Sequence, residues 1–273
     1  MRNLGGKRAL VTGAGSGIGR AIALALARKG VQLFLVDIDP DNLRASAHDA
    51  DALGVRVLFK ICDVSNTEEI KACATACLSD FGGLDILVNC AGLLVYGHVN
   101  EMSAESWDAV LAVNLLAPIQ FTRELLPALA AQSESHILNV CSLVGLVPAR
   151  KLASYQTSKF GLVGFSLALR TAYSRYNVGV TALCPSFVDT PMLQQMGPKW
   201  YRQSTKFGPL TLLMSPEGVA KRAISAIRRN KGIDVVPSAA KLVWFAYRIA
   251  PSFFVWLFSH RFRLRARRHR LPS

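Results

Sequence analysis

The sequence from residue 12 to residue 19 reads Thr12-Gly13-Ala14-Gly15-Ser16-Gly17-Ile18-Gly19. A mostly apolar stretch, residues 7–12, leads into it, and an alanine- and leucine-rich helical pattern, residues 20–29, follows it. A strand, a glycine-rich turn and a helix in this order let the backbone approach a pyrophosphate at the positive end of the helix. A tight turn without a ligand is the alternative. The pattern predicts a dinucleotide site that uses Gly13, Ser16, Gly17, Ile18 and Gly19.

An acidic residue ends the next apolar run. Residues 31–36 predict a second strand, and Asp37 follows it, eighteen residues after Gly19. A carboxylate at about this distance accepts from the adenosine ribose of NAD and would repel the 2′-phosphate of NADP. The glycine loop before Gly17 has no lysine or arginine that would attract this phosphate. Both points favour NAD over NADP, with a turn or capping aspartate as the alternative role of Asp37.

Apolar runs and helical patterns alternate along the chain as far as about residue 240. The runs that we expect to form strands are residues 7–12, 31–36, 55–61, 84–88, 137–141, 178–183 and 233–236. A long helical pattern from Ser103 to about Ala131 contains Pro118, which should kink or restart the helix. The alternation predicts an α/β fold: a Rossmann-type, doubly wound, parallel seven-stranded sheet with helices on both faces. We expect a single domain over residues 1–240, with residues 186–214 as a substrate lid.

A tyrosine and a lysine lie four residues apart in the stretch Ser154-Tyr155-Gln156-Thr157-Ser158-Lys159. On a helix, Tyr155 and Lys159 share one face. The lysine charge favours the phenolate, so we expect it to lower the tyrosine pKa from its usual value near ~10. Such a phenol can exchange a proton with an alcohol or a ketone near neutral pH. The spacing alone also suits a surface pair, so its meaning depends on the other motifs.

These motifs together resemble the short, single-domain branch of the short-chain dehydrogenase/reductase superfamily over about residues 5–237. The matching residues are Thr12-Gly13-x-x-x-Gly17-x-Gly19, Asp63, Asn89-x-Ala91-Gly92, Asn114, Ser142, Tyr155-x-x-x-Lys159, and Pro185 with Thr190. Ser142 lies thirteen residues before Tyr155, as the family pattern requires. The resemblance implies hydride transfer between a nicotinamide cofactor and an alcohol or a ketone.

The resemblance also implies roles for the matching residues. Tyr155 would be the general acid/base, and Lys159 would lower its pKa and bind the nicotinamide ribose. Ser142 would hydrogen-bond the substrate oxygen, and Asn114 would hold a water for proton relay. The cofactor-binding residues outside the glycine loop would be Asp37, Asp63 and Val64 near the adenosine, Asn89, Ala91 and Gly92 along it, and Pro185, Val188 and Thr190 beside the nicotinamide.

Two positions depart from the family pattern. The second residue of the usual Asn-Asn-Ala-Gly is Cys90, and the usual glycine after Pro185 is Ser186. A side chain at residue 186 restricts a backbone that glycine would leave free. We therefore expect a different shape in the loop on the nicotinamide side, while each proton-transfer residue is present.

Charge and cysteine usage argue against several other classes. The formal net charge is +14, but six arginines and no acidic residue lie between Arg261 and Arg270. This favours a local basic tail and argues against a nucleic-acid surface on the body. None of the six cysteines forms a Cys-x-x-Cys pair, so we expect no metal site and a reducing compartment. Lys7-Arg8 leads directly into a strand, without a signal-peptide pattern, so we expect a cytoplasmic protein.

The composition changes after Ser238. Residues 242–258 include seven aromatic residues, one charge at Arg248 and one proline at Pro251. The stretch is short for a membrane span, but its aromatic residues suit a membrane interface and the arginines after it suit anionic head groups. We expect residues 241–273 to form an interfacial anchor of two short helices broken at Pro251, peripheral on the cytoplasmic face of a membrane. Packing against the protein's own subunits and a true span are the alternatives.

These features predict an NAD-dependent oxidoreductase that interconverts a secondary alcohol and a ketone. The substrate should be small and hydrophobic or lipid-like, because apolar residues follow the motifs at Leu93–Tyr96, Val144 and Leu146 and recur in the expected lid. An NADP-dependent reductase of a lipid carbonyl is one alternative. A membrane-tethered nucleotide-binding protein without turnover is another, against which the set Ser142, Tyr155 and Lys159 speaks. The resemblance also implies a dimer or a tetramer.

Overall fold

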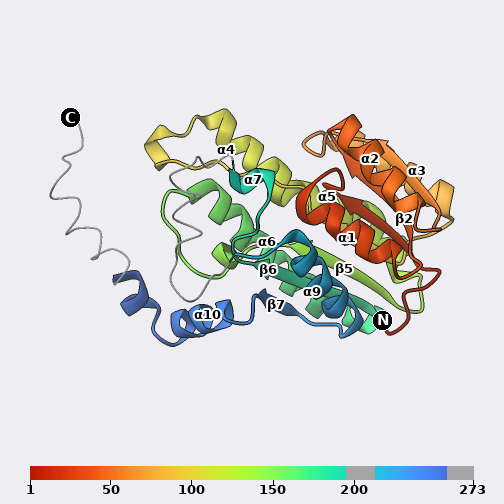
Figure 1. Cartoon of the computed structure of the whole chain (residues 1–273). Coiled ribbons are helices and arrows are strands. Elements are labelled where there is room, and N and C mark those ends of the chain that lie inside the picture. The colour runs from red at the N-terminus through yellow and green to blue at the C-terminus, as the bar shows by residue number, and fades with distance from the viewer. Residues whose placement is uncertain (195–212, 257–273) are drawn as a thin grey trace.

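A computed structural model describes residues 1–194 and 213–256 of the chain (Figure 1). Seven parallel strands form one sheet in the order β3-β2-β1-β4-β5-β6-β7. The strands are β1 (Arg8–Thr12), β2 (Gln32–Asp37), β3 (Val57–Ile61), β4 (Ile86–Asn89), β5 (Ser135–Val140), β6 (Val178–Pro185) and β7 (Ile233–Val236). This confirms the predicted doubly wound sheet. The strand order reverses between β1 and β4, the place at which open α/β sheets bind ligands.

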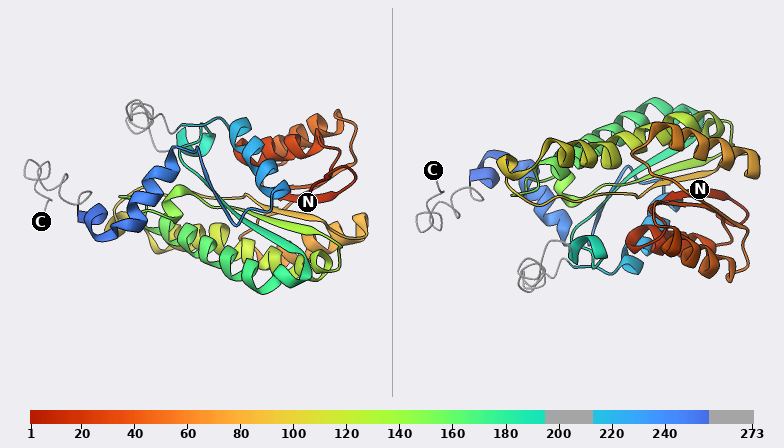
Figure 2. Two further views of the ribbon diagram at one scale, coloured as in Figure 1. Left: turned by 90° about the horizontal axis from the view of Figure 1, so that it is seen from below. Right: turned by 90° about the horizontal axis from the view of Figure 1, so that it is seen from above.

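Helices cover both faces of the sheet (Figure 2). One layer consists of α1 (Gly17–Ala27), α2 (Pro40–Asp51) and α9 (Pro216–Arg228). The opposite layer consists of α3 (Thr67–Phe81), α4 (Ala104–Leu111), α5 (Ala117–Ala130) and α6 (Ala153–Tyr173). Within β1, Ala9 and Val11 face the first layer while Leu10 faces the second. Because both faces of the strands are buried, the strands read as continuous apolar runs.

The expected long helix after Ser103 is divided into two helices. A π-helical segment, Ala112–Leu116, separates α4 from α5, and Pro118 lies in the first turn of α5. Proline has no N–H to donate to the carbonyl four residues earlier, which is that of Asn114. The π-helical turn therefore lies where the series of helical hydrogen bonds is interrupted. By length and composition, the whole run Ala104–Ala130 could cross a membrane. Val113, Phe121 and other buried residues of this run instead pack into the core beneath the sheet.

Strand β5 begins at Ser135, two residues before its predicted start at Ile137. The ring of His136 is buried and lies 2.9 Å from the hydroxyl of Thr181 in β6. A polar pair satisfied in this way is compatible with a buried strand, and hydropathy alone did not reveal it.

The C-terminal part leaves the sheet after β7. Helix α10 (Ala240–Ile249) is followed by a break at Ala250 and a second helical stretch, residues 251–256. This matches the prediction of two short helices broken near Pro251. The predicted lid is described only at its ends, because residues 195–212 lie outside the described residues. These ends include α7 (Pro191–Gln194) and a bridge between Val188 and Met214.

Candidate active site

The N-terminus of α1 is prepared for an anion. Ser16 occupies the N-cap but its side chain makes no capping hydrogen bond, and α1, which is described over its whole length, has no acidic residue in its first turn. By contrast, Asp39 caps α2 and Asn66 caps α3 with side-chain hydrogen bonds. The first N–H groups of α1 can therefore serve a pyrophosphate, which the helix dipole also favours.

Glycine is required where the loop before α1 meets the end of β4. Gly13 has a φ of +66°, and a Cβ on it would lie 2.8 Å from the Cα of Ala91. A Cβ on Gly19 would collide with the carbonyl of Gly13. The close approach at Gly13 brings the glycine loop and the segment after β4 together, so that Gly13, Ala91 and Gly92 would form one floor for a dinucleotide.

Thr12 holds this floor in place, and the sequence reasoning did not single it out as a site residue. Its hydroxyl accepts hydrogen bonds from the N–H groups of Cys90 and Ala91 at 3.0 and 3.1 Å. Its place at the head of the glycine motif was the available signal. The side chain of Asn89 faces the sheet interior, where its amide donates to Asn139 at 2.8 Å. Asn89 therefore fixes the end of β4, rather than presenting its side chain to a cofactor.

The two predicted acidic residues lie at neighbouring strand ends. Asp37 ends β2, and its carboxylate accepts from the N–H of Gly15 at 2.8 Å and from that of Asp39 at 3.0 Å. It is thus oriented by the glycine loop and lies where an adenosine ribose would reach it. Asp63 follows β3 and accepts from the N–H and the hydroxyl of Ser65 at 2.9 and 2.8 Å. Val64 packs into the core, so only its backbone can face a cofactor.

Asn114 connects the π-helical segment to both sides of the site. Its amide oxygen accepts from the N–H of Leu93 at 2.7 Å, and its amide nitrogen donates to the carbonyl of Leu93 at 2.8 Å and to the hydroxyl of Ser158 at 3.1 Å. The side chain is fully buried. It fixes the segment after Gly92 against α6, one residue before Lys159.

Lys159 is buried at the carboxyl end of β5. Its ammonium donates to the carbonyl of Val140 at 2.9 Å and lies 5.6 Å from the ring centre of Tyr155. Gly145 allows this packing, because a Cβ on it would lie 2.7 Å from the carbonyl oxygen of Lys159. Burial lowers the pKa of Lys159.

The pKa of Tyr155 differs from the sequence-based expectation. Burial raises it to about 12, and a hydrogen bond with Ser142 acts in the opposite direction. The net shift is thus opposite to the expected one, because burial in an apolar environment outweighs the lowering that we expected from the charge of Lys159, whose ammonium donates to Val140. Tyr155 is therefore protonated at neutral pH here, and poised as a proton donor.

A cavity of about 110 Å³ joins Tyr155 and Ser142 to apolar side chains. Its apolar lining comes from Ile18, Leu94, Leu143, Val144, Leu152, Pro185, Phe187, Val188, Met192 and Leu193. Of the residues expected to suit an apolar pocket, Leu146 packs instead in the core, and Leu93 and Tyr96 are exposed. Thr190 also borders the cavity, and a Cβ on Gly17 would lie 3.2 Å from its methyl group. The loop after β6 thus meets the glycine loop, as a nicotinamide site requires.

The departure at Ser186 is accommodated at the end of β6. Its N–H donates to the carbonyl of Val236 at 2.8 Å, which extends the pairing of β6 with β7. The segment then bridges to Met214, which donates to Phe187 and accepts from Asp189, both at 2.9 Å. These backbone contacts fix the loop that carries Val188 and Thr190 beside the cavity.

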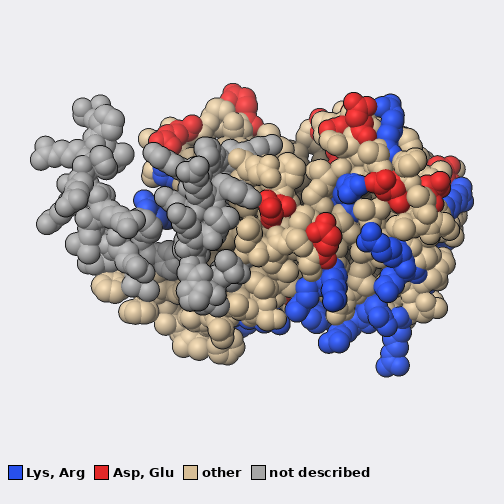
Figure 3. All heavy atoms as spheres, in the orientation of Figure 1, with Lys and Arg blue, Asp and Glu red and all other residues tan. Residues whose placement is uncertain are grey.

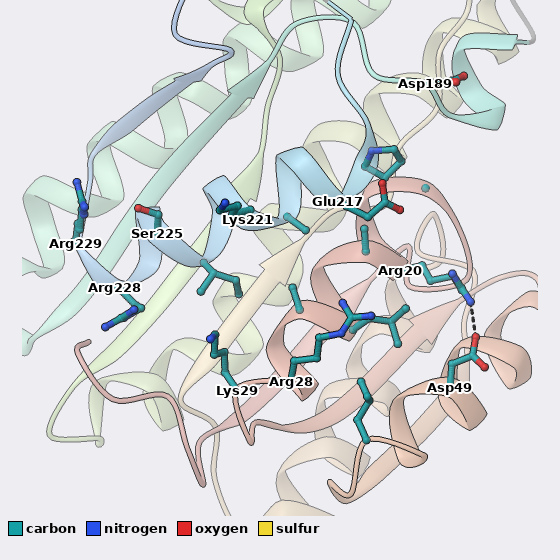
Figure 4. A pocket seen from close by; sticks show the side chains of 18 of the residues that line it. Arg20, Arg28, Lys29, Asp49, Asp189, Glu217, Lys221, Ser225, Arg228 and Arg229 are labelled. Atoms are coloured by element: carbon teal, nitrogen blue, oxygen red, sulfur yellow. Dashed lines mark hydrogen bonds and ion pairs between the residues drawn. The ribbon is translucent and has the colours of Figure 1, made fainter.

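A larger groove lies along α1 and α9, away from Tyr155 (Figure 4). It begins at Gly17 and is lined by seven lysines and arginines against three acidic residues. Arg20 pairs with Asp49 across its rim. In Figure 3, lysine and arginine side chains gather along the lower edge of the molecule near these helices. Ser142 and Tyr155 do not line this groove, so it is separate from the predicted catalytic residues, and its charge favours anions near the glycine loop.

The described residues fit a nicotinamide dinucleotide. The uncapped α1, the close approach at Gly13 and the oriented carboxylate of Asp37 would hold its pyrophosphate and adenosine half. Thr190 and Val188 would border the nicotinamide, next to Tyr155. Among the described residues, no group of three or more His, Cys, Asp or Glu side chains is arranged to hold a metal ion.

Comparison with known proteins agrees with this geometry. A model of the family described as short chain dehydrogenase matches residues 7–200. The D-beta-hydroxybutyrate dehydrogenase of Cupriavidus necator is 38% identical over 193 residues, which are 70% of this chain and 74% of that protein. The 3-oxoacyl-(acyl-carrier-protein) reductase FabG of Thermotoga maritima is 32% identical over 218 residues, 80% of this chain and 89% of that protein. The structure of levodione reductase has the same fold, with a TM-score of 0.79 and 24% identity over 84% of this chain and 95% of that one.

Proposed function

Because this chain belongs to the short-chain dehydrogenase/reductase family, we propose that it is an NAD-dependent enzyme that interconverts a hydrophobic secondary alcohol and its ketone. Membership of the family establishes the coarser statement, an oxidoreductase of alcohol and ketone groups that uses NAD or NADP. The observation that carries the finer proposal is the meeting of the Tyr155 phenol and the Ser142 hydroxyl in an apolar cavity.

Tyr155 moves the proton in the proposed reaction. In the direction of reduction, the phenol, which is protonated at neutral pH, donates its proton to the carbonyl oxygen. In the direction of oxidation, the phenolate takes the proton of the alcohol. Ser142, which hydrogen-bonds the phenol, would donate to the same substrate oxygen as negative charge develops on it.

Lys159 and Asn114 support this proton transfer without contacting the substrate. The buried ammonium lies close enough to the ring of Tyr155 to stabilise the phenolate. Asn114 fixes the backbone at Leu93 and the helix at Ser158, and we propose that it also helps to hold a water that relays the proton of Lys159. The bound nicotinamide supplies the hydride chemistry.

Asp37 supports NAD as the cofactor. Its carboxylate already accepts two backbone hydrogen bonds and retains lone pairs for the ribose hydroxyls. A 2′-phosphate placed there would face a like charge at short range, which is unfavourable. NADP-dependent reduction of a lipid carbonyl is the outcome that would overturn the proposal of NAD as the cofactor.

A turnover screen tests the proposal. The protein is incubated with NAD or NADP and a panel of hydrophobic alcohols, and in the reverse direction with the corresponding ketones. We expect turnover with NAD, and we expect Tyr155→Phe to lose about 10²-fold or more of kcat while NAD binding by calorimetry is kept. Tyr176→Phe, on the exposed end of the turn after α6, is the matched control. NAD binding without turnover on any substrate would favour a non-catalytic nucleotide-binding protein.

Self-association is part of this proposal. Leu116, Phe160 and Leu167 are exposed apolar residues on the π-helical segment and on α6, and together they suit contact with a second copy. Light scattering should give the mass of a dimer or a tetramer, and Phe160→Glu should shift the oligomeric state toward the monomer. A monomeric protein would contradict this point and leave the reaction unaffected.

A further inference from the structure

Helix α10 is apolar on two opposite faces. On the inner face, Trp244 and Tyr247 pack against a core cluster of β6, β7 and α6. On the outer face, Leu242, Phe245 and Ile249 are 70%, 63% and 72% exposed. Residues 242, 245 and 249 recur at helical spacing, so they form one continuous stripe. Packing on the protein's body explains the inner face, and leaves the outer stripe to be explained.

The stripe continues into the second helical stretch, residues 251–256. Phe253 and Val255 are 60% and 45% exposed. Phe254 is tied back to α10, because its N–H donates to the carbonyl of Ala250 at 3.0 Å and its ring lies 5.6 Å from that of Tyr247. The two helices therefore present their exposed apolar residues from a connected support.

The charge around the stripe has a single sign. Lys241 and Arg248 are exposed on α10, on the flank between its two apolar faces, and Arg248 lies 5.4 Å from the ring centre of Trp244. The sequence has no Asp or Glu after Asp234, and it carries six arginines between Arg261 and Arg270. Apolar residues flanked by cations complement a surface that is both hydrophobic and negatively charged.

We propose that the outer face of α10 and residues 251–256 form a peripheral docking surface for an anionic lipid membrane. The ten residues of α10 are about 15 Å long, and a bilayer core is about 30 Å thick, so the helix lies in the interface and does not cross it. Aromatic and aliphatic side chains would enter the head-group region, and Lys241 and Arg248 would meet the phosphates. The family model ends at residue 200, so this surface is an addition to the matched segment. The inference does not rest on the proposed reaction.

The docking surface lies next to the substrate cavity. Cys141 and Leu143 line that cavity, and they also belong to the cluster on which the inner face of α10 packs. The core cluster on which α10 packs therefore extends to the wall of the apolar cavity. This placement suits a substrate that partitions into lipid.

Vesicle flotation of the full-length protein tests the docking surface. The vesicles are phosphatidylcholine alone or phosphatidylcholine with phosphatidylglycerol. We expect binding to the mixed vesicles, weakened by salt. The double variant Phe245→Glu/Ile249→Glu should lower the partition coefficient about tenfold or more, because it places charge in the apolar stripe. Replacing the six arginines from Arg261 to Arg270 by glutamine should remove the preference for phosphatidylglycerol.

The matched control is Phe59→Glu/Ile61→Glu. Phe59 and Ile61 are exposed on β3, the strand at the opposite edge of the sheet from β7, so this variant makes the same change in charge away from α10. It should bind vesicles like the unaltered protein. Absence of binding by the unaltered protein, or equal loss in the control, would overturn the proposal. So would unchanged vesicle binding of Phe245→Glu/Ile249→Glu together with a smaller oligomer in light scattering, which would assign the stripe to a contact between copies.

Discussion

The ammonium of Lys159 donates a hydrogen bond to the carbonyl of Val140 and lies 5.6 Å from the ring centre of Tyr155. The lysine thus places a charge behind the phenol without bonding to it. Burial meanwhile raises the pKa of Tyr155 to about 12. The balance between burial and this charge sets the proton affinity of the phenol, which can be measured from the pH dependence of turnover.

Removing the charge of Lys159 should shift that pH dependence. Phenolate is the base in alcohol oxidation, and a pKa raised above neutrality means that its fraction, and with it the rate, increases with pH. In Lys159→Met the phenolate loses a nearby cation, so we expect the rising limb of kcat/KM to move to higher pH by about one unit or more. Lys151→Met is the matched control, since Lys151 also lies 5.6 Å from a tyrosine ring, that of Tyr96. An unmoved limb in Lys159→Met would exclude this role.

The carboxylate of Asp37 should control the choice of cofactor. Asp37→Asn keeps one oxygen, which can accept from either Gly15 or Asp39 but not from both, and it removes the charge that would face a 2′-phosphate. We expect the ratio of kcat/KM for NADP to that for NAD to rise about tenfold or more, equivalent to roughly 1.4 kcal/mol. Asp39→Asn, which alters the cap of α2, should leave the ratio unchanged. If the unaltered protein already prefers NADP, the argument from Asp37 fails.

Local patterns predicted the sheet and the order of the motifs, because each strand, glycine turn and helix start depends on residues that are consecutive in the sequence. The contacts that assemble the site join distant segments. The hydroxyl of Thr12 reaches Cys90 and Ala91, and Asn114 joins Leu93 to Ser158. Sequence spacing gives no measure of such contacts. The pKa of Tyr155 was misjudged for the same reason, since burial is a property of the folded chain.

Asn114 should contribute to stability as well as to the site. Asn114→Ala would leave the N–H and the carbonyl of Leu93 without the partners that the amide now supplies. The Asn114 side chain makes three hydrogen bonds, and each contributes about 0.5–1.5 kcal/mol. We therefore expect the free energy of unfolding in urea to fall by about 2–4 kcal/mol. Ser158→Ala removes a single partner of Asn114 and should cost about 1 kcal/mol. Equal losses in the two variants would contradict the bridging role of Asn114.

His136 should make the protein less stable in acid. The hydroxyl of Thr181 donates to the carbonyl of Lys231, so Nε2 of His136, 2.9 Å from that hydroxyl, carries the proton that it donates to Thr181. Burial lowers the pKa of His136 from 6.5 to about 3. Between these values the unfolded chain binds a proton that the folded protein does not. Stability is therefore lost as pH falls below about 6.5, by at most about 1.4 kcal/mol per pH unit.

A variant without the titrating ring isolates this effect. In His136→Gln the amide can still donate to Thr181, but it binds no proton, so we expect the unfolding free energy, measured in urea between pH 6.5 and pH 4, to depend less on pH than in the unaltered protein. His48→Gln is the control, because His48 is exposed on α2 and its replacement should preserve the slope. A slope that His136→Gln leaves unchanged would mean that the buried ring takes up its proton without unfolding, and that the strand pairing of β5 with β6 tolerates the charge.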